Sequence, residues 1–230
     1  MHNGIPTLVG FAAIALLAGV TLYYNRRRAG ARRAQMASFG RSLGLAYSHR
    51  DHSRILRTSP QPLIADSQAR RTRNVLSGAY RGYSLRAFDY DYALKKGPRY
   101  VQKITCVLVQ TPMRCPLLVV RPIDASERLE RSAGPGHLTF ESGAFNRRFR
   151  VTCGEPKFAF DVVHTRAMAH LLDNRPLRIE AAGSTVLFCL NDRSSPLFIP
   201  GEMRLLLDAA CDFMDLLPAY LLANRGAAPF

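Results

Sequence analysis

Residues 83–94 read YSLRAFDYDYAL, and this stretch decides which class of fold the chain can adopt. Aromatic and acidic residues alternate along its second half in the order Phe88, Asp89, Tyr90, Asp91 and Tyr92. Successive side chains of a β-strand point to opposite faces of its sheet. The alternation therefore predicts a strand whose aromatic face is buried and whose acidic face is exposed to solvent.

Further strand signals flank this stretch on both sides. Residues 74–80 precede it across a turn at Gly82, and a KKGP turn at residues 95–98 follows it. Later segments are expected to form strands at residues 100–110, 117–120, 138–140 and 149–154, and a hairpin of residues 177–182 with 185–191 around Gly183 and Ser184. Strands that follow one another this closely predict an antiparallel meander.

Two segments carry the periodicity of amphipathic helices. Residues 156–173 and residues 201–217 both repeat apolar side chains every three or four positions. The opposite face of the second helix carries Asp208, Asp212 and Asp215. An apolar stripe of this period faces a core. The chain is therefore predicted to be α+β, with a mostly antiparallel sheet and two packed helices within residues 74–224.

The first residues of the chain have a different character. Residues 5–24 read IPTLVGFAAIALLAGVTLYY, which is 20 residues without a charge. At ~1.5 Å per residue, a helix of this length spans ~30 Å, the thickness of the hydrocarbon core of a bilayer. A cleaved signal peptide begins with a basic segment, but residues 1–4 (MHNG) hold no Lys or Arg. We therefore expect a transmembrane helix.

The basic residues predict how this helix is oriented. The net charge is +15, and residues 26–73 alone hold 12 Arg and two acidic residues, a balance of +10. The five juxtamembrane arginines that directly follow the apolar segment are Arg26, Arg27, Arg28, Arg32 and Arg33. Positive residues favour the cytoplasmic side, so a single-pass protein of the cell membrane with a cytoplasmic body is predicted. The cysteines agree, because five widely spaced cysteines are typical of reduced thiols.

Residues 25–73 are predicted to form a basic arm and linker. The helix is expected to continue to about Gly44, and residues 48–72 read as an irregular connection. We expect the juxtamembrane arginines to contact anionic lipid headgroups, because each basic residue close to such a surface contributes about 1 kcal/mol. Two alternatives stay open: the arginines serve topology alone, or the arm folds back onto the acidic helix face. Nucleic acid is not an expected partner, because base-stacking aromatic residues do not accompany the charges.

The predicted organisation has five parts. They are a short tail (1–4), a transmembrane helix (5–24), the basic arm and linker (25–73), a cytoplasmic α+β domain (74–224) and a C-terminal tail (225–230). Ala15 and Gly19 place two small residues four positions apart in the apolar segment, a spacing that permits close helix–helix packing. A homodimer through this helix face is one arrangement that the sequence permits.

One motif resembles a known family. Residues 141–151 read ESGAFNRRFRV, and residues 158–172 read FAFDVVHTRAMAHLL. With the aromatic strand and the acidic helix, they resemble a family of bacterial membrane-anchored domains of unknown function, in which an acid-x-x-x-Phe-Asn-basic-x-Phe-x-Val strand precedes a helix. The resemblance implies a fold and a membrane anchor, and it implies no activity. From the residues alone, Phe145, Phe149 and Val151 are expected to face the core.

The sequence assigns no catalytic residue, no cofactor and no metal site. His164 and His170 lie six positions apart, so a helix turns them to different faces, and no CxxC or HxxxH pair is present. Glycine-rich phosphate loops and the GxSxG turn are also missing. The favoured function is a non-enzymatic binding or scaffold domain at the inner membrane surface. The alternative is a membrane-associated enzyme with an unrecognised site around Asp89, Asp91 and His164.

Overall fold

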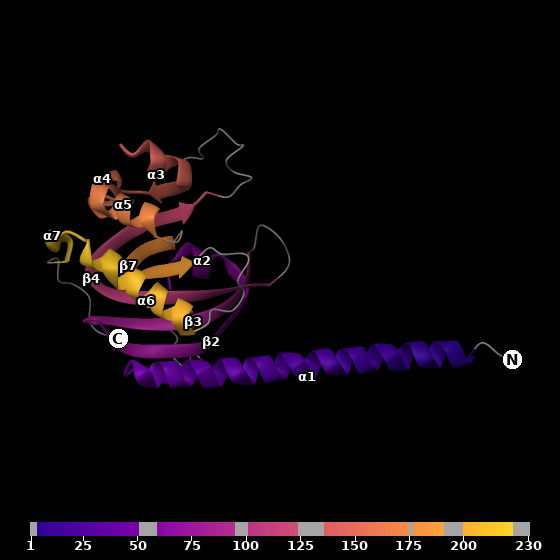
Figure 1. The fold of residues 1–230 in the computed structure, drawn as a ribbon. Coiled ribbons are helices and arrows are strands. Elements are labelled where there is room, and N and C mark those ends of the chain that lie inside the picture. The colour runs from indigo at the N-terminus through magenta and orange to yellow at the C-terminus, as the bar shows by residue number, and fades with distance from the viewer. Residues whose placement is uncertain are drawn as a thin grey trace.

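The described residues form an α+β fold, in which helices pack on a seven-stranded antiparallel sheet (Figure 1). The computed structural model describes residues 4–50, 59–94, 101–123, 136–174, 177–190 and 200–222, with the side chains of the first helix from Ile14 onward. The elements in chain order are α1 (Gly4–Ser42), β1 (Ala46–Arg50), α2 (Pro62–Ala65), β2 (Ser67–Tyr80), β3 (Tyr83–Leu94), β4 (Gln102–Pro122), β5 (His137–Leu138), α3 (Gly143–Arg148), β6 (Phe149–Cys153), α4 (Pro156–Val162), α5 (Thr165–Asp173), β7 (Leu177–Leu190), α6 (Pro200–Asp215) and α7 (Ala219–Leu222).

Strand β4 is the centre of the sheet. Its first half pairs with β3, from Leu85 opposite Val109 to Tyr92 opposite Gln102, and its second half pairs with β6. Strand β7 runs antiparallel along both halves of β4. Beyond β3 the sheet continues through β2 to β1, and beyond β6 it ends at β5. The long strand β4 therefore joins two groups of strands into one sheet.

Two strands are longer than the sequence predicted. Strand β4 passes through Pro112 and Pro116 without ending, and β7 is one strand where we expected a hairpin around Gly183. The pairing of β4 with β7 shifts register on both sides of Cys115, which lies opposite Gly183. Gly183 has a φ of +62°, which glycine adopts without steric cost. The prolines and the glycine that resemble turn residues in the sequence therefore lie at β-bulges. A bulge bends a strand, and the pairing with the neighbouring strand continues beyond it.

The sheet also begins earlier in the chain than predicted. Strand β1 and the start of β2 lie in the region that we expected to be arm and linker. Strand β2 pairs with β3 from Ser67 opposite Leu94, and β1 pairs with β2. Strand β1 is an edge strand in which no side chain is fully buried. Because it needs no apolar face, it shows no apolar alternation in the sequence.

The helix predicted at residues 156–173 is two helices. Val163 and His164 separate α4 from α5 and have non-helical backbone angles. Val163 is fully buried, whereas Phe160 of α4 is 47% exposed. The break therefore turns the two segments so that different side chains reach the core. The acidic helix was predicted correctly, and it corresponds to α6.

The motif at residues 141–151 is a short helix followed by the strand that we predicted from residue 149, where the family resemblance implied a strand throughout. Ser142 caps α3, because its hydroxyl accepts a hydrogen bond from the Phe145 nitrogen at 3.2 Å. Strand β6 then begins at Phe149. Phe145, Phe149 and Val151 are all buried, which confirms their predicted place in the core.

Two clusters of buried side chains lie on opposite faces of the sheet. Ala87 and Val107 belong to the larger cluster, together with residues of α4, α5, α6 and the end of α1. Phe88, Tyr90 and Tyr92 belong to the smaller cluster, which packs against α2. The aromatic face of β3 is therefore buried, as its alternation predicted.

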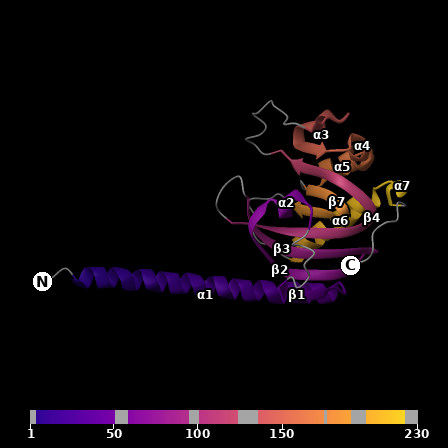
Figure 2. The same cartoon turned by 180° about the vertical axis from the view of Figure 1, so that it is seen from behind.

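Helix α1 is continuous and ends near Gly44, as predicted. Gly44 has a φ of +70°, and the Leu45 nitrogen donates to the Gly40 carbonyl oxygen at 2.8 Å, which closes the helix. Near this end Met36 and Phe39 are buried in the core, whereas the N-terminal part of α1 extends away from the sheet (Figures 1 and 2). Within the part of the chain that the structure describes, none of the helices combines the length and the hydropathy of a transmembrane span.

Candidate functional site

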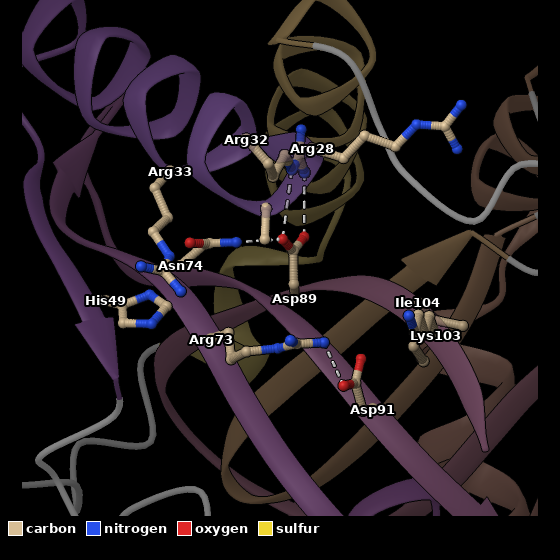
Figure 3. Close-up of a pocket in the computed structure, with 11 residues that line it drawn as sticks. Arg28, Arg32, Arg33, His49, Arg73, Asn74, Asp89, Asp91, Lys103 and Ile104 are labelled. Carbon is tan, nitrogen blue, oxygen red and sulfur yellow. Dashed lines mark hydrogen bonds and ion pairs between the residues drawn. The ribbon is translucent and has the colours of Figure 1, made fainter. Parts of the chain in front are cut away.

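One face of the sheet changes from apolar to polar where it meets α1. The cross-strand pairs on this face of β3 and β4 are, in order, Ala87 with Val107, Asp89 with Thr105, and Asp91 with Lys103. The first pair is fully buried in the core. Along β3, the buried apolar side chains are thus followed on this face by two carboxylates, which lie next to the arginine-rich part of α1 (Figure 3).

Arg32 of α1 binds Asp89 of β3 with two hydrogen bonds. Its Nε lies 3.3 Å from Oδ2, and its Nη2 lies 3.0 Å from Oδ1 (Figure 3). The two side chains are only 6% and 13% exposed. A planar guanidinium matches both carboxylate oxygens in this geometry. Because the two residues are 57 positions apart in the sequence, their contact attaches α1 to the sheet.

Asp89 accepts two further hydrogen bonds from the sheet. They come from Asn74 Nδ2 at 2.8 Å and from Thr105 Oγ1 at 3.1 Å. Asn74 has a φ of +52° and lies at a register shift between β2 and β3, and such a bulge can redirect a side chain. The Tyr47 hydroxyl donates to Asn74 Oδ1 at 3.0 Å, and burial raises the pKa of Tyr47, which keeps this donor protonated. The orientation of Asp89 is thus determined by α1 and three strands.

Asp91 is paired as well, with Arg73 of the neighbouring strand β2. The Asp91 side chain is 11% exposed and the Arg73 side chain is 32% exposed. We expected the acidic face of β3 to be open to solvent, and this expectation was wrong. Helix α1 and Arg73 cover the face, because each carboxylate needs a cationic partner when it leaves bulk water.

A cavity of about 410 Å³ lies between α1 and these strands, and we call it the α1 cavity (Figure 3). Its cationic lining residues are Arg28, Arg32, Arg33, Arg73 and Lys103. Asp89 and Asp91 are the acidic ones among the described lining residues, so five positive and two negative described side chains leave three positive charges. An electropositive cavity of this kind attracts anions.

Two buried nitrogen atoms at the α1 cavity have no hydrogen-bond partner within the described part of the chain. They are Nη1 of Arg32 and Nδ1 of His49. A buried polar atom without a partner is costly, and an unpaired guanidinium nitrogen is a donor. The arrangement can therefore bind an anion that accepts hydrogen bonds.

The three residues of the predicted enzyme site do not come together. Asp89 and Asp91 share the α1 cavity, as their common strand face predicted. His164 does not line the cavity, and it lies between α4 and α5 with its Nε2 2.9 Å from the Leu216 carbonyl oxygen. Among the described residues, no three metal-ligating side chains are grouped.

The five juxtamembrane arginines divide into two sets. Arg32 is buried against Asp89 of the body, and its contact with a lipid headgroup stays a prediction. Arg26, Arg27, Arg28 and Arg33 are exposed, and their contact with lipid stays a prediction. The homodimer through Ala15 and Gly19 also stays a prediction.

The acidic face of α6 binds an arginine of the body. Arg81, in the turn between β2 and β3, places Nη1 2.6 Å from Asp212 and Nη2 3.0 Å from Asp215. Asp208 lies 3.8 Å from the same guanidinium. Within the described residues, the arm reaches the body through the contact of Arg32 with Asp89.

Sequence reasoning missed four polar residues of the cavity: His49, Arg73, Asn74 and Lys103. The sequence did contain a signal for Lys103. Lys103 and Thr105 alternate with the apolar residues Ile104 and Cys106 in a predicted strand, which places both polar side chains on one face. Arg73 and Asn74 lie where we expected a linker to end. Their place depends on the register of β2 against β3, which includes a bulge.

All five cysteines are described, and all are free thiols. Cys106, Cys115, Cys189 and Cys211 are buried, and Cys153 is half-buried. Burial raises the pKa of Cys115 to about 12 and that of Cys211 to about 11. The thiols therefore lie in or beside the core, as their apolar surroundings predicted.

No family model and no curated protein matches this chain. Among solved structures, it is similar to the crystal structure of the mycobacterial trehalose monomycolate transport factor A, TtfA, with a TM-score of 0.55. The sequences are 13% identical over 86% of this chain and 98% of that chain. At this identity, the similarity extends to the fold alone.

Proposed function

We propose that this chain is a single-pass membrane protein whose body is a binding or scaffold domain at the inner membrane surface. Residues 5–24 would span the bilayer, and the arginines after them would lie on the cytoplasmic side. The observation that carries the proposal is the continuity of α1, which runs unbroken from the apolar segment to Met36 and Phe39 in the core. A continuous helix would hold the body close to the membrane without a flexible linker.

The residues at the end of the apolar segment support this placement. Tyr23 and Tyr24 are 61% and 56% exposed, as expected for aromatic residues at a membrane interface. Arg28 follows Tyr24 by four residues, which is ~6 Å along a helix. The first cavity residue would therefore lie at the level of the headgroups.

Extraction of membranes at alkaline pH tests the anchor. The full chain should stay in the membrane pellet, and the double variant Ile14→Arg/Leu17→Arg should be released, because each charge at the centre of a span costs about 2.5–3.5 kcal/mol. The matched control is Leu205→Arg/Tyr220→Arg, which adds the same charges at exposed apolar positions of α6 and α7. Release of the unaltered chain, or equal release of both variants, would contradict the proposal.

Labelling with a membrane-impermeant thiol reagent tests the orientation. Arg166 is exposed on α5, so an Arg166→Cys variant carries a reporter far from the helix. On intact spheroplasts this cysteine should stay unlabelled, and it should react after lysis. Reaction before lysis would place the body on the outer side.

A further inference from the structure

We propose that the α1 cavity binds the phosphate group of an anionic lipid headgroup. The inference builds on the proposed membrane anchor, which brings the cavity to the headgroup layer. Phosphate could also arrive as the free anion, and both sources would use the same cationic side chains. The position of the cavity along α1 favours the lipid.

The described side chains of the cavity carry more positive than negative charge, which favours the binding of an additional anion. Asp89 and Asp91 are already paired with Arg32 and Arg73. Arg28, Arg33 and Lys103 also line the cavity, and they make no ion pair within the described ranges. Within the described part of the chain these three cations have no acidic partner, and a phosphate is the common anion that several such groups bind together.

A buried donor marks where the anion would bind. The Arg32 side chain is 6% exposed, and Asp89 uses its Nε and Nη2. Its Nη1 is buried at the cavity without a partner among the described residues. Asp89 thus holds the guanidinium in one orientation and leaves one donor group for a ligand. A phosphate oxygen would complete the hydrogen bonds of Arg32.

The volume and the lining residues of the α1 cavity are compatible with a lipid headgroup. The volume of about 410 Å³ lies within the usual range for ligand sites. Among the described lining residues none is Phe, Tyr or Trp, the large aromatic side chains on which many proteins stack nucleotide bases. The site is therefore suited to a phosphate rather than to a nucleic acid.

The position of the cavity along α1 favours the membrane as the source. Arg28 and Arg32 follow Tyr24 by four and eight residues, or ~6 and ~12 Å of helix. The polar layer on each side of a bilayer is roughly 5–8 Å thick. A helix that crosses the membrane through residues 5–24 would place the near end of the cavity within this layer.

Native mass spectrometry of the full chain in a neutral detergent would test the site. The probes are dihexanoyl phosphatidylglycerol, which is anionic, dihexanoyl phosphatidylcholine, which is zwitterionic, and inorganic phosphate. We expect phosphatidylglycerol to be retained at least about tenfold more tightly than the other two, a difference of about 1.4 kcal/mol. The double variant Arg33→Ala/Lys103→Ala should weaken this binding about thirtyfold, which corresponds to about 1 kcal/mol per charge.

The matched control is Arg26→Ala/Arg27→Ala, which removes the same charge from α1 outside the cavity. It should change the affinity less than threefold, an upper bound of about 0.7 kcal/mol. Arg32 is left intact in both variants, because its loss would unpair Asp89, and circular dichroism would verify that each variant is folded.

Equal losses in the two double variants, or equal binding of both lipids, would overturn the cavity site. Binding of inorganic phosphate as tight as that of phosphatidylglycerol would overturn the lipid assignment. Because these measurements use detergent, they fail independently of membrane extraction, which tests the anchor itself.

Discussion

Two arginines join helices to the sheet, and they do so in different surroundings. Arg32 and Asp89 connect α1 to β3 with side chains that are 6% and 13% exposed. Arg81 meets the aspartates of α6 with a side chain that is 39% exposed, and those aspartates are 36–51% exposed. The second group has more ion pairs, and one of them is shorter. We expect burial, and not the number of contacts, to decide how much each contact affects stability.

The largest effect is expected for Arg32→Ala. The substitution leaves the buried Asp89 carboxylate with its two sheet donors and without its ion-pair partner, which should lower the free energy of unfolding by about 3 kcal/mol. Urea unfolding of the full chain in a mild detergent, followed by circular dichroism, would measure it. Arg33→Ala is the control, because this neighbour is exposed and should change stability by at most about 0.5 kcal/mol. Equal losses in the two variants would contradict our assignment.

Double-mutant cycles would sharpen the comparison. We expect Arg32 and Asp89 to have a coupling energy of about 2 kcal/mol, because the two side chains are only 6% and 13% exposed and are joined by two hydrogen bonds. Arg81 and Asp212 should couple by at most about 0.5 kcal/mol, because Asp208 and Asp215 remain beside the guanidinium. Similar coupling energies would mean that the two sites are equivalent despite their burial.

A smaller loss is expected for Arg81→Ala. Its exposed pairs are screened by water and salt, so stability should fall by at most about 1 kcal/mol. The difference from the unaltered chain should shrink between about 0.1 and 1 M salt, because the Debye length falls from ~10 to ~3 Å. A loss that matched Arg32→Ala, or one that salt left unchanged, would refute the assignment of this site as exposed.

The smallest effect is a pH dependence at Tyr83. Its hydroxyl donates to Asp215 at 2.6 Å, and burial, followed by this hydrogen bond, raises the pKa of Tyr83 above its usual value. The folded chain then holds the phenol proton above pH ~10, where the unfolded chain releases it. Stability from this group is therefore present below pH ~10 and is lost as pH rises further. The stability advantage of the unaltered chain over Tyr83→Phe should narrow between pH 9 and 11, and a constant difference would contradict this.

Local patterns predicted the parts of the fold that depend on local packing. The alternation around Tyr90 predicted β3 and its buried aromatic face, and the periodicity around Phe213 predicted α6. The hairpin at Gly183 was wrong, because a glycine in a bulge resembles a glycine in a turn until the partner strand is known. Cys115 of β4 supplies that partner, 68 positions away by residue number.

The candidate site was also predicted only in part, because some of its contacts are local and others join residues that are distant in the sequence. Asp89 and Asp91 were identified as neighbours from their spacing, which depends on one strand. The sequence analysis did not predict that α1 covers these two carboxylates. Arg32 lies 57 positions before Asp89 in the sequence, and we had assigned it to the lipid surface. An arginine near a membrane segment carries the same sequence signal whether it meets a headgroup or a buried carboxylate. The fold has to be known before the two can be separated.

Our central claim is that α1 and the body form one rigid unit, attached through Arg32 and Asp89. Spin labels at Ala31 of α1 and Arg166 of α5, both exposed, would report it in the full chain, with Cys153→Ser removing the half-buried thiol. Pulsed electron paramagnetic resonance should give one narrow distance distribution in both detergent and nanodiscs, and Arg32→Ala should broaden it. A broad distribution in the unaltered chain would show that α1 is a flexible tether, and would contradict the claim.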